Sequence, residues 1–98
     1  MKDWIFEMVD KSGIKIHLSK DVWNHITTKH TNMSDKLEDI KKALTNPILI
    51  ISNQYDENKR NYFLHYKHKN RYLLVSVKYL NGEGYITTAF IARHIKKR

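Results

Sequence analysis

Apolar and polar residues alternate along positions 4–9 and again along 14–18, on either side of the turn-forming run 10–13. An alternation with a period of two is typical of a strand that buries one of its two faces. Two such strands joined by a short turn containing glycine form a hairpin. The pattern therefore predicts an N-terminal β-hairpin within residues 1–18.

The apolar spacing becomes helical between residues 19 and 46. Val22, Trp23 and Ile26 recur at intervals of three and four, which is the spacing of one face of a helix. Ser19 precedes this stripe and offers a side-chain oxygen as an N-cap. A second helical stripe follows, and it has to end before Pro47 because the residue before a proline disfavours helical dihedrals. We expect two helices within this segment.

Residues 48–93 read as four strands, and each connection between them is too short to hold a crossover helix. Strands joined in this way form an antiparallel meander. The expected fold is α+β, with two helices packed on one face of a four-stranded antiparallel sheet and the hairpin attached. One domain is expected over residues 1–98, ending in a basic tail at 94–98.

The two faces of the predicted sheet follow from the period of two. Leu73, Val75 and Val77 form an apolar row that fits the helix side, and the opposite row of that strand is mixed. On the last strand both rows contain apolar residues. Periodicity alone therefore does not decide whether Thr87 or Thr88 faces away from the helices.

Charge is distributed unevenly along the 98 residues. The net formal charge is +8, with −1 in residues 1–58 and +9 in residues 59–98. The second part also contains five of the six tyrosines. Cations neutralise phosphates and aromatic rings stack on unpaired bases, so this part favours a nucleic-acid partner over a charge that serves solubility alone.

Several classes of function are excluded or disfavoured by composition. Without cysteine, the chain has no thiol catalysis, disulfide or thiolate metal site. The longest strongly apolar run, at 48–51, is too short to cross a bilayer, and no basic amphipathic helix indicates a membrane surface. The start of the chain does not resemble a secretory leader. We expect a cytoplasmic protein without a membrane partner.

Metal-independent cleavage of RNA is a reaction that this composition can support. The 2′-hydroxyl acts as the nucleophile, and the protein supplies a base, an acid and cations for the developing phosphorane charge. Histidine suits the proton transfers at neutral pH. The sequence has no paired carboxylates typical of a two-metal nuclease, and neither its histidine spacings nor a glycine-rich loop indicate a metal or cofactor site. No cofactor is expected.

The order of these signals resembles the small phage-linked nucleases of the barnase–EndoU–colicin–RelE-like (BECR) group. The resemblance covers about residues 19–95. It implies that the helical histidine, here His30, and a threonine before a small and an aromatic residue, here Thr88, belong to the active site. Members of the group often have Pro and Glu after the histidine, whereas this chain has Thr31 and Asn32. The residues that carry the resemblance are Lys29-His30, Leu37 to Leu44, Asn46-Pro47-Ile48, Asn61-Tyr62-Phe63, Leu73 to Lys78 and Ile86-Thr87-Thr88-Ala89-Phe90.

The sequence thus predicts a metal-independent endoribonuclease of toxin or phage-effector type that cleaves single-stranded RNA or tRNA through the 2′-hydroxyl. His30 is expected to act as acid or base, Lys78 to stabilise phosphate charge, and Thr88 to orient the phosphate. The basic surface also fits an acidic antitoxin or immunity protein. The residues expected to bind nucleic acid are His25, Lys29, Tyr62, Tyr66, Arg71 and Arg93.

Two other readings stay open at the level of sequence. The same basic sheet can serve a nucleic-acid-binding module without catalysis, which predicts salt-sensitive binding and no cleavage products. Alternatively, the charge can meet an acidic protein partner in an interaction domain, which predicts little affinity for nucleic acid at physiological salt.

Overall fold

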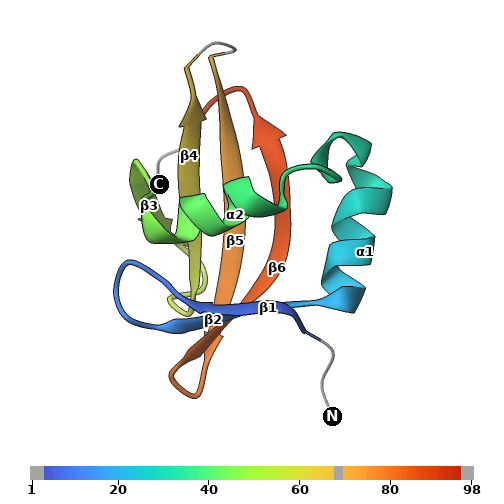
Figure 1. Cartoon of the computed structure of the whole chain (residues 1–98). Coiled ribbons are helices and arrows are strands. Elements are labelled where there is room, and N and C mark those ends of the chain that lie inside the picture. Colours follow the sequence, from blue (N-terminus) through green and yellow to red (C-terminus); the bar gives the residue numbers. More distant parts are fainter. Residues whose placement is uncertain (1–3, 68–69, 96–98) are drawn as a thin grey trace.

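The computed structural model of the chain describes residues 4–67 and 70–95. The run 96–98, predicted as the end of a basic tail, lies outside the described residues. Helices and strands make up most of the described residues (Figure 1). They are β1 (Trp4–Val9), β2 (Lys15–Ser19), α1 (Lys20–Lys29), the short 3₁₀ helix η1 (Thr31–Met33), α2 (Leu37–Thr45), β3 (Leu49–Ser52), β4 (Lys59–Tyr66), β5 (Arg71–Leu80) and β6 (Glu83–Ala92).

All six described strands belong to one mixed sheet, in the order β1-β2-β6-β5-β4-β3. The expectation of a four-stranded antiparallel sheet with a separate hairpin is therefore wrong, although the fold is α+β. Strands β3 to β6 form an antiparallel meander, and β2 then pairs with β6 in parallel at only two positions, Ile16 with Gly84 and His17 with Tyr85. The hairpin runs across the lower end of the meander (Figure 1).

The residues at the junction between β2 and β6 explain why the hairpin joins the sheet there. Gly84 lies so close to its neighbours that an added Cβ would stand 2.5 Å from Ile16 Cδ1 and 2.8 Å from Val77 Cγ1. The absence of a side chain at this position therefore lets the two strands approach. A period of two shows which residues a strand buries but not which strand lies beside it, so the sequence pattern did not reveal this pairing.

His17 stabilises the same junction between β2 and β6, on the opposite face of the sheet. Its ring is 4% exposed and packs against the rings of Trp4 and Tyr85, at centroid distances of 4.5 and 4.9 Å, and those two rings are themselves 6.2 Å apart. Its Nδ1 lies 2.8 Å from a carboxylate oxygen of Glu7, and its Nε2 contacts Glu83. These contacts link β1, β2 and β6, which the two backbone pairs alone would hold weakly.

Only one of the two helices packs across the sheet. Helix α2 crosses β4 and β5, whereas α1 lies beside β6 (Figure 1). The expectation that both helices cover one face is therefore corrected. Because β2 pairs with β6 only up to Tyr85, no strand of the described residues lies beside the rest of the outer edge of β6, and α1 lies along that edge. Ser19 caps α1 as predicted, its hydroxyl accepting the Val22 N–H at 3.1 Å.

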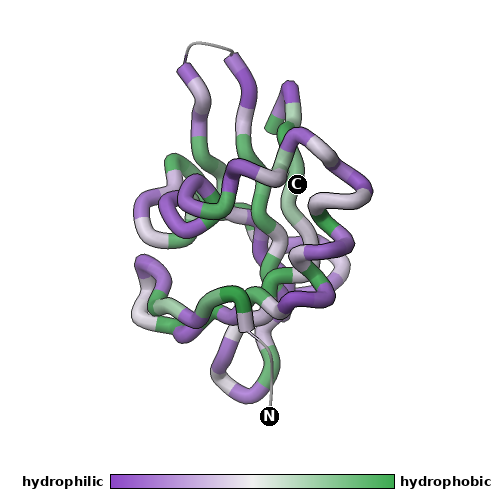
Figure 2. The backbone as a smooth tube through the Cα atoms, turned by 45° about the vertical axis from the view of Figure 1, so that its right-hand side comes forward, coloured by the Kyte–Doolittle hydropathy of each residue, from purple (hydrophilic) through white to green (hydrophobic). Residues whose placement is uncertain are grey.

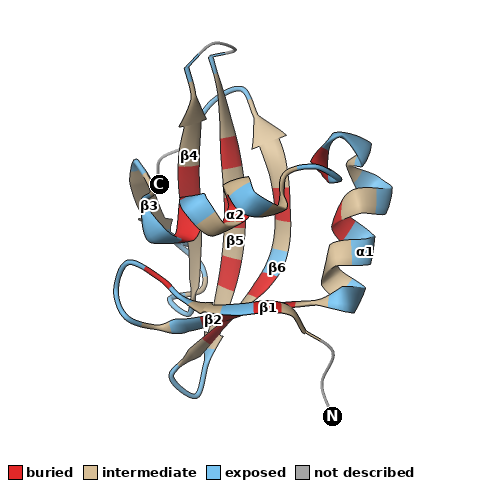
Figure 3. Cartoon of the chain, viewed as in Figure 1, coloured by how far each residue is buried: buried red, intermediate tan, exposed pale blue. Residues whose placement is uncertain are grey.

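The core lies between α2 and the sheet, and Ile26 of α1 and Met33 of η1 extend it beside β6. Buried positions follow one another along the middle of β4, β5 and β6 and on the inner side of α2 (Figure 3). Apolar stretches run along the strands, and the helices carry many hydrophilic residues (Figure 2). Leu73, Val75 and Val77 are fully buried, which confirms the row that the sequence assigns to the helix side. The opposite row is the open face, which α2 does not cover.

A bulge in β6 explains why periodicity could not assign its two rows. Thr88 pairs with Ser76, but Ile86 pairs with Val77, so Thr87 is an extra residue in the ladder. Ile86 and Ala89 are consequently both buried on the helix side, although an odd number of steps separates them. Thr88 lies on the open face, and the Thr87 hydroxyl donates to the Ser76 carbonyl at 3.3 Å.

A buried polar cluster ties the hairpin turn to the meander. Asp10 is 5% exposed, and its Oδ1 accepts the backbone N–H groups of Ser12 and Ile14 at 2.8 and 2.9 Å. Its Oδ2 accepts the Tyr62 hydroxyl at 2.5 Å, and that hydroxyl also contacts the Tyr79 hydroxyl. Burial, followed by the bond to Asp10, raises the pKa of Tyr62, which keeps its proton available to Asp10.

No helix in the described part of the chain is long and apolar enough to cross a membrane.

Candidate functional site

His30 ends α1 and begins the turn into η1. Its backbone N–H closes the helix on the Ile26 carbonyl at 2.8 Å, and its carbonyl accepts the Met33 N–H. The ring is half-buried and stacks on Phe90 of β6, with centroids 5.6 Å apart. The end of a helix and a stacked ring thus fix the imidazole at the edge of the sheet, where a substrate on the surface can meet it.

Thr88 lies two residues before Phe90 on the same face of β6. The residues are separated by about 7 Å along a strand, and both are half-buried. The bulge at Thr87 immediately precedes this pair, and bulges bend a strand and re-aim the side chains beside them. The structure therefore brings Thr88 and the His30–Phe90 pair to one length of β6.

Lys78 does not join this group. It pairs with Tyr85, whereas Phe90 pairs with Leu74, so the two levels are about 13 Å apart along β5. Its Nζ also lies 2.5 Å from a carboxylate oxygen of Asp56 in the β3–β4 loop. A lysine neutralised in this way and set at the other end of the strand is poorly placed to stabilise phosphate charge beside His30.

The Asp56–Lys78 pair gives a pH-dependent prediction. The hydrogen bond from Lys78, followed by that from the Asn58 N–H, holds the pKa of the Asp56 carboxyl below its ordinary value. A lowered folded-state pKa means that the pair stabilises the fold above the unfolded-state pKa, and that this contribution is lost as the pH falls through the folded-state value. Carboxyl NMR titration should give a lower Asp56 midpoint in the native chain than in Lys78→Ala.

A matched control for this titration is the Lys41–Glu38 pair on the surface of α2, which Lys78→Ala should leave unchanged. Equal Asp56 midpoints in the native chain and in Lys78→Ala would contradict the pairing.

The two tyrosines that were predicted to bind nucleic acid, Tyr62 and Tyr66, face the helix side instead. Tyr62 is fully buried, and its hydroxyl donates to Asp10, so no face of its ring can meet a base; that expectation is corrected. Tyr66 is half-buried and donates to Asp39 of α2 at 2.7 Å. Burial, and then the hydrogen bond to Asp39, raise the pKa of Tyr66, so it stays a neutral phenol. The period of two put both tyrosines opposite Phe63 but did not say which row faces α2.

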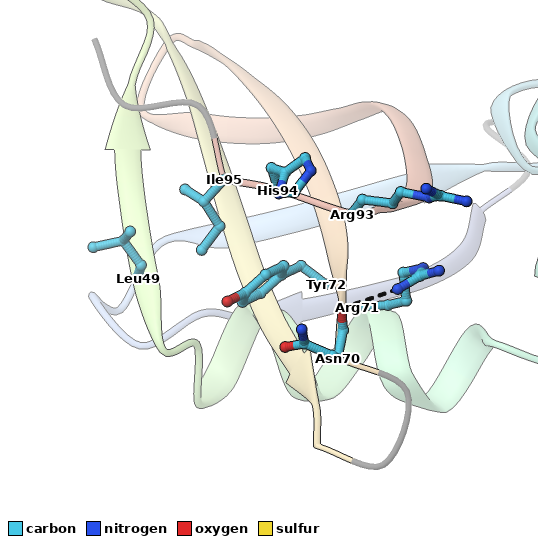
Figure 4. A pocket seen from close by; sticks show the side chains of 7 residues that line it. All are labelled: Leu49, Asn70, Arg71, Tyr72, Arg93, His94 and Ile95. Atoms are coloured by element: carbon cyan, nitrogen blue, oxygen red, sulfur yellow. Dashed lines mark hydrogen bonds between the residues drawn. The ribbon is translucent and has the colours of Figure 1, made fainter.

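Arg71 and Arg93 both lie at the upper end of the sheet, where β5 begins and β6 ends. Beyond β6 the chain turns across the open face, so that His94 and Ile95 approach Tyr72 and Leu49 (Figure 4). A pocket of about 500 Å³ lies between them, lined by Leu49, Asn70, Arg71, Tyr72, Arg93, His94 and Ile95. We call it the larger pocket. Arg71 and Arg93 extend toward the same side of it (Figure 4).

A second pocket of about 270 Å³ lies on the helix side of the same end. It is lined by Asn32, Lys36, Tyr66, Arg71 and Ile91. We call it the smaller pocket. Arg71 lines both pockets. Asn32 follows His30 by two residues, and Ile91 follows Phe90 in β6 but faces the helix side of the sheet.

The remaining predicted residues lie away from these pockets. His25 and Lys29 are exposed on α1, within one turn of His30, and neither lines a described pocket. His17 is the most buried histidine with a described environment, and its enclosure by two rings leaves it no access to a polymer. Sequence reasoning missed Asn32, Lys36 and His94. Helical and strand periodicity carries no signal for residues that lie in short connections, such as η1 and the residues just before α2 and after β6.

Residues 4–67 and 70–95 contain no group of three or more His, Asp or Glu side chains arranged to hold a metal ion. That the reaction proceeds without metal stays a prediction, which a cleavage assay has to test.

Comparison with known proteins gave no match to a family model, a curated protein or a solved structure.

Proposed function

We propose that the chain is an endoribonuclease of toxin or phage-effector type that cleaves RNA through the 2′-hydroxyl without a metal ion. The observation that carries the proposal is the placement of His30. Its ring stacks on Phe90 at the edge of the sheet. Asn32, two residues further along the chain, lines the smaller pocket together with Arg71. Histidine is the side chain best suited to proton transfer at neutral pH.

The proposed reaction breaks the bond from phosphorus to the 5′-oxygen and forms a bond from phosphorus to the 2′-oxygen. A base removes the proton of the 2′-hydroxyl, whose oxygen attacks phosphorus while the bond to the 5′-oxygen breaks. An acid protonates that leaving oxygen, which gives a 2′,3′-cyclic phosphate and a 5′-hydroxyl. His30 performs one of the two transfers, and His94 is an exposed histidine at the same end of the sheet that can be tested for the other.

Arginine takes over the role that the sequence assigned to Lys78. Guanidinium groups form forked hydrogen bonds to phosphate, and electrostatic stabilisation of the transition state is a large part of such catalysis. Arg71 and Arg93 lie at the end of the sheet that Phe90 approaches, whereas Lys78 is paired with Asp56. Thr88 keeps its proposed role as a hydroxyl that orients the phosphate.

The direct test is cleavage of single-stranded RNA by purified protein in excess EDTA. We expect products that end in a 2′,3′-cyclic phosphate, and no cleavage of the same sequence made of DNA or 2′-O-methyl RNA. Single-stranded RNA, tRNA and duplex DNA should be compared in parallel. Cleavage that requires added metal ions would overturn the metal-independent mechanism.

Salt-sensitive binding without any cleavage product would instead favour a nucleic-acid-binding module built on the same basic surface. One observation favours this alternative: Lys78 is paired with Asp56, which removes one predicted catalytic cation.

A further inference from the structure

We propose that the smaller pocket is a base-recognition subsite for an unpaired adenine, and that Asn32 reads that base. The proposal rests on the proposed RNA-directed function and adds to it the residue that sets sequence preference. It is built on the contents of the two pockets and on the charge around each.

The two pockets differ in electrostatic character. The residues that line the larger pocket include two arginines and His94 and no acid. The lining of the smaller pocket also includes two cations, Lys36 and Arg71, but carboxylates lie next to it: Asp35 is 3.1 Å from the Lys36 ammonium, and Asp39 accepts the Tyr66 hydroxyl. A phosphate therefore favours the larger pocket and its arginines, and the smaller pocket is better suited to a neutral group such as a base.

The composition of the smaller pocket fits one base. Its volume of about 270 Å³ lies below the roughly 300–1,000 Å³ of pockets that enclose drug-sized ligands. Ile91 supplies an apolar wall for the face of a ring, and Asn32 supplies an amide with donors and an acceptor. Asparagine forms two hydrogen bonds with adenine, accepting from N6 and donating to N7.

Arg71 connects the subsite to the backbone of the substrate. Arg71 lines both pockets. An RNA strand that crosses this end of the sheet can therefore place a phosphate on Arg71 and the base of the same nucleotide in the smaller pocket. A base can enter such a pocket only when it is splayed out of a helix, which is how single strands and loops of RNA are read.

The test measures binding of 2′-O-methyl RNA pentamers, which the proposed reaction cannot cleave, by fluorescence anisotropy. The four pentamers carry adenine, guanine, cytosine or uracil at the central position. Their other positions are uridines, except for a cytidine at one flank. We expect the native chain to bind the adenine pentamer about tenfold more tightly than the others. Asn32→Ala should lose this preference and keep its affinity for the other three pentamers.

The matched control removes the amide that lines the larger pocket. Asn70 has a positive φ of 51°, so Asn70→Gly deletes the side chain without straining the turn. This variant should keep the adenine preference. Asn32 is exposed in η1, so its replacement is not expected to unfold the chain, and thermal melting followed by circular dichroism checks this.

Equal binding of all four pentamers by the native chain, absence of binding, or a preference that survives Asn32→Ala would each overturn the inference. These outcomes are distinct from a failure of the proposed function. A chain that binds adenine through Asn32 but cuts no RNA keeps the subsite and loses the nuclease. A chain that cuts RNA without an Asn32-dependent preference keeps the nuclease and loses the subsite.

Discussion

Replacing His30 by phenylalanine is expected to lower the rate of RNA cleavage by about 10²- to 10⁴-fold, the usual contribution of a general acid or base. Phenylalanine keeps a ring against Phe90 but cannot carry a proton, so packing is retained while the chemistry is lost. Cleavage of a fluorescent RNA under single-turnover conditions gives the rate, and the melting temperature of the same sample shows that the fold is intact.

His30→Ala and His25→Ala complete this comparison. The alanine at position 30 removes the ring as well, so its activity should match that of His30→Phe, while its stability falls by about 1 kcal/mol through loss of the stack. His25, which the sequence placed among the nucleic-acid-binding residues, is exposed on α1 and lines neither described pocket, so its replacement should leave the activity unchanged. If His30→Phe cleaves RNA at the native rate, the imidazole serves only as a packed ring and the proposed mechanism is wrong.

Replacing Asp10 by alanine is expected to lower the free energy of unfolding by about 3 kcal/mol. The carboxylate accepts three hydrogen bonds, from Ser12, Ile14 and the buried Tyr62 hydroxyl, and alanine leaves those donors without this partner. A domain of this size is stabilised by only about 5–15 kcal/mol in total. Urea unfolding at neutral pH gives the change directly, and the melting temperature should fall by about 15 °C.

Tyr62→Phe is the matched variant for this effect. It removes the hydroxyl alone, so only one of the three hydrogen bonds to Asp10 is lost and the expected destabilisation is about 1 kcal/mol. A change below about 1 kcal/mol in Asp10→Ala itself would show that the cluster does not hold the hairpin turn to the meander.

Local elements were predictable from the sequence because their signals are local. The caps, turns and periods that define α1, α2 and the strands involve residues within a few positions of one another, and Ser19 is a clear case. The inner row of β5 followed from alternation alone, since the row opposite Leu73, Val75 and Val77 is mixed and offers no second apolar face.

The arrangement of the elements depended on contacts that no local pattern contains. The pairing of β2 with β6 rests on a close approach at Gly84 and on the enclosure of His17, which involve residues almost 70 positions apart. The position of α1 beside β6 follows from that pairing, because β2 leaves most of the β6 edge without a strand. Tyr62 was misplaced for the same reason, since its partner Asp10 lies 52 residues away.

The candidate site was predictable only in part. His30 and Thr88 came from the resemblance to a nuclease group, and the structure puts both on the upper length of β6 or against it. Lys78 was chosen for its strand row, and a row does not reveal an ion pair with a loop residue such as Asp56. Asn32 and Lys36 lie between two helices, where side chains gather only once the chain is folded.

The extra residue in β6, Thr87, affects the geometry of the proposed site but is not needed to bury the core. Counted from Gly84 to Ile91 without Thr87, the strand alternates without a break, so Thr87 alters the direction of the strand and leaves the facing of its neighbours unchanged. A descendant that lost this single codon would still bury Ile86 and Ala89 and would still fold. Its Phe90 would meet the His30 ring at a different angle, and Thr88 would be re-aimed with it. Under the proposed function, such a one-codon deletion would be a short evolutionary route from RNA cleavage to RNA binding alone.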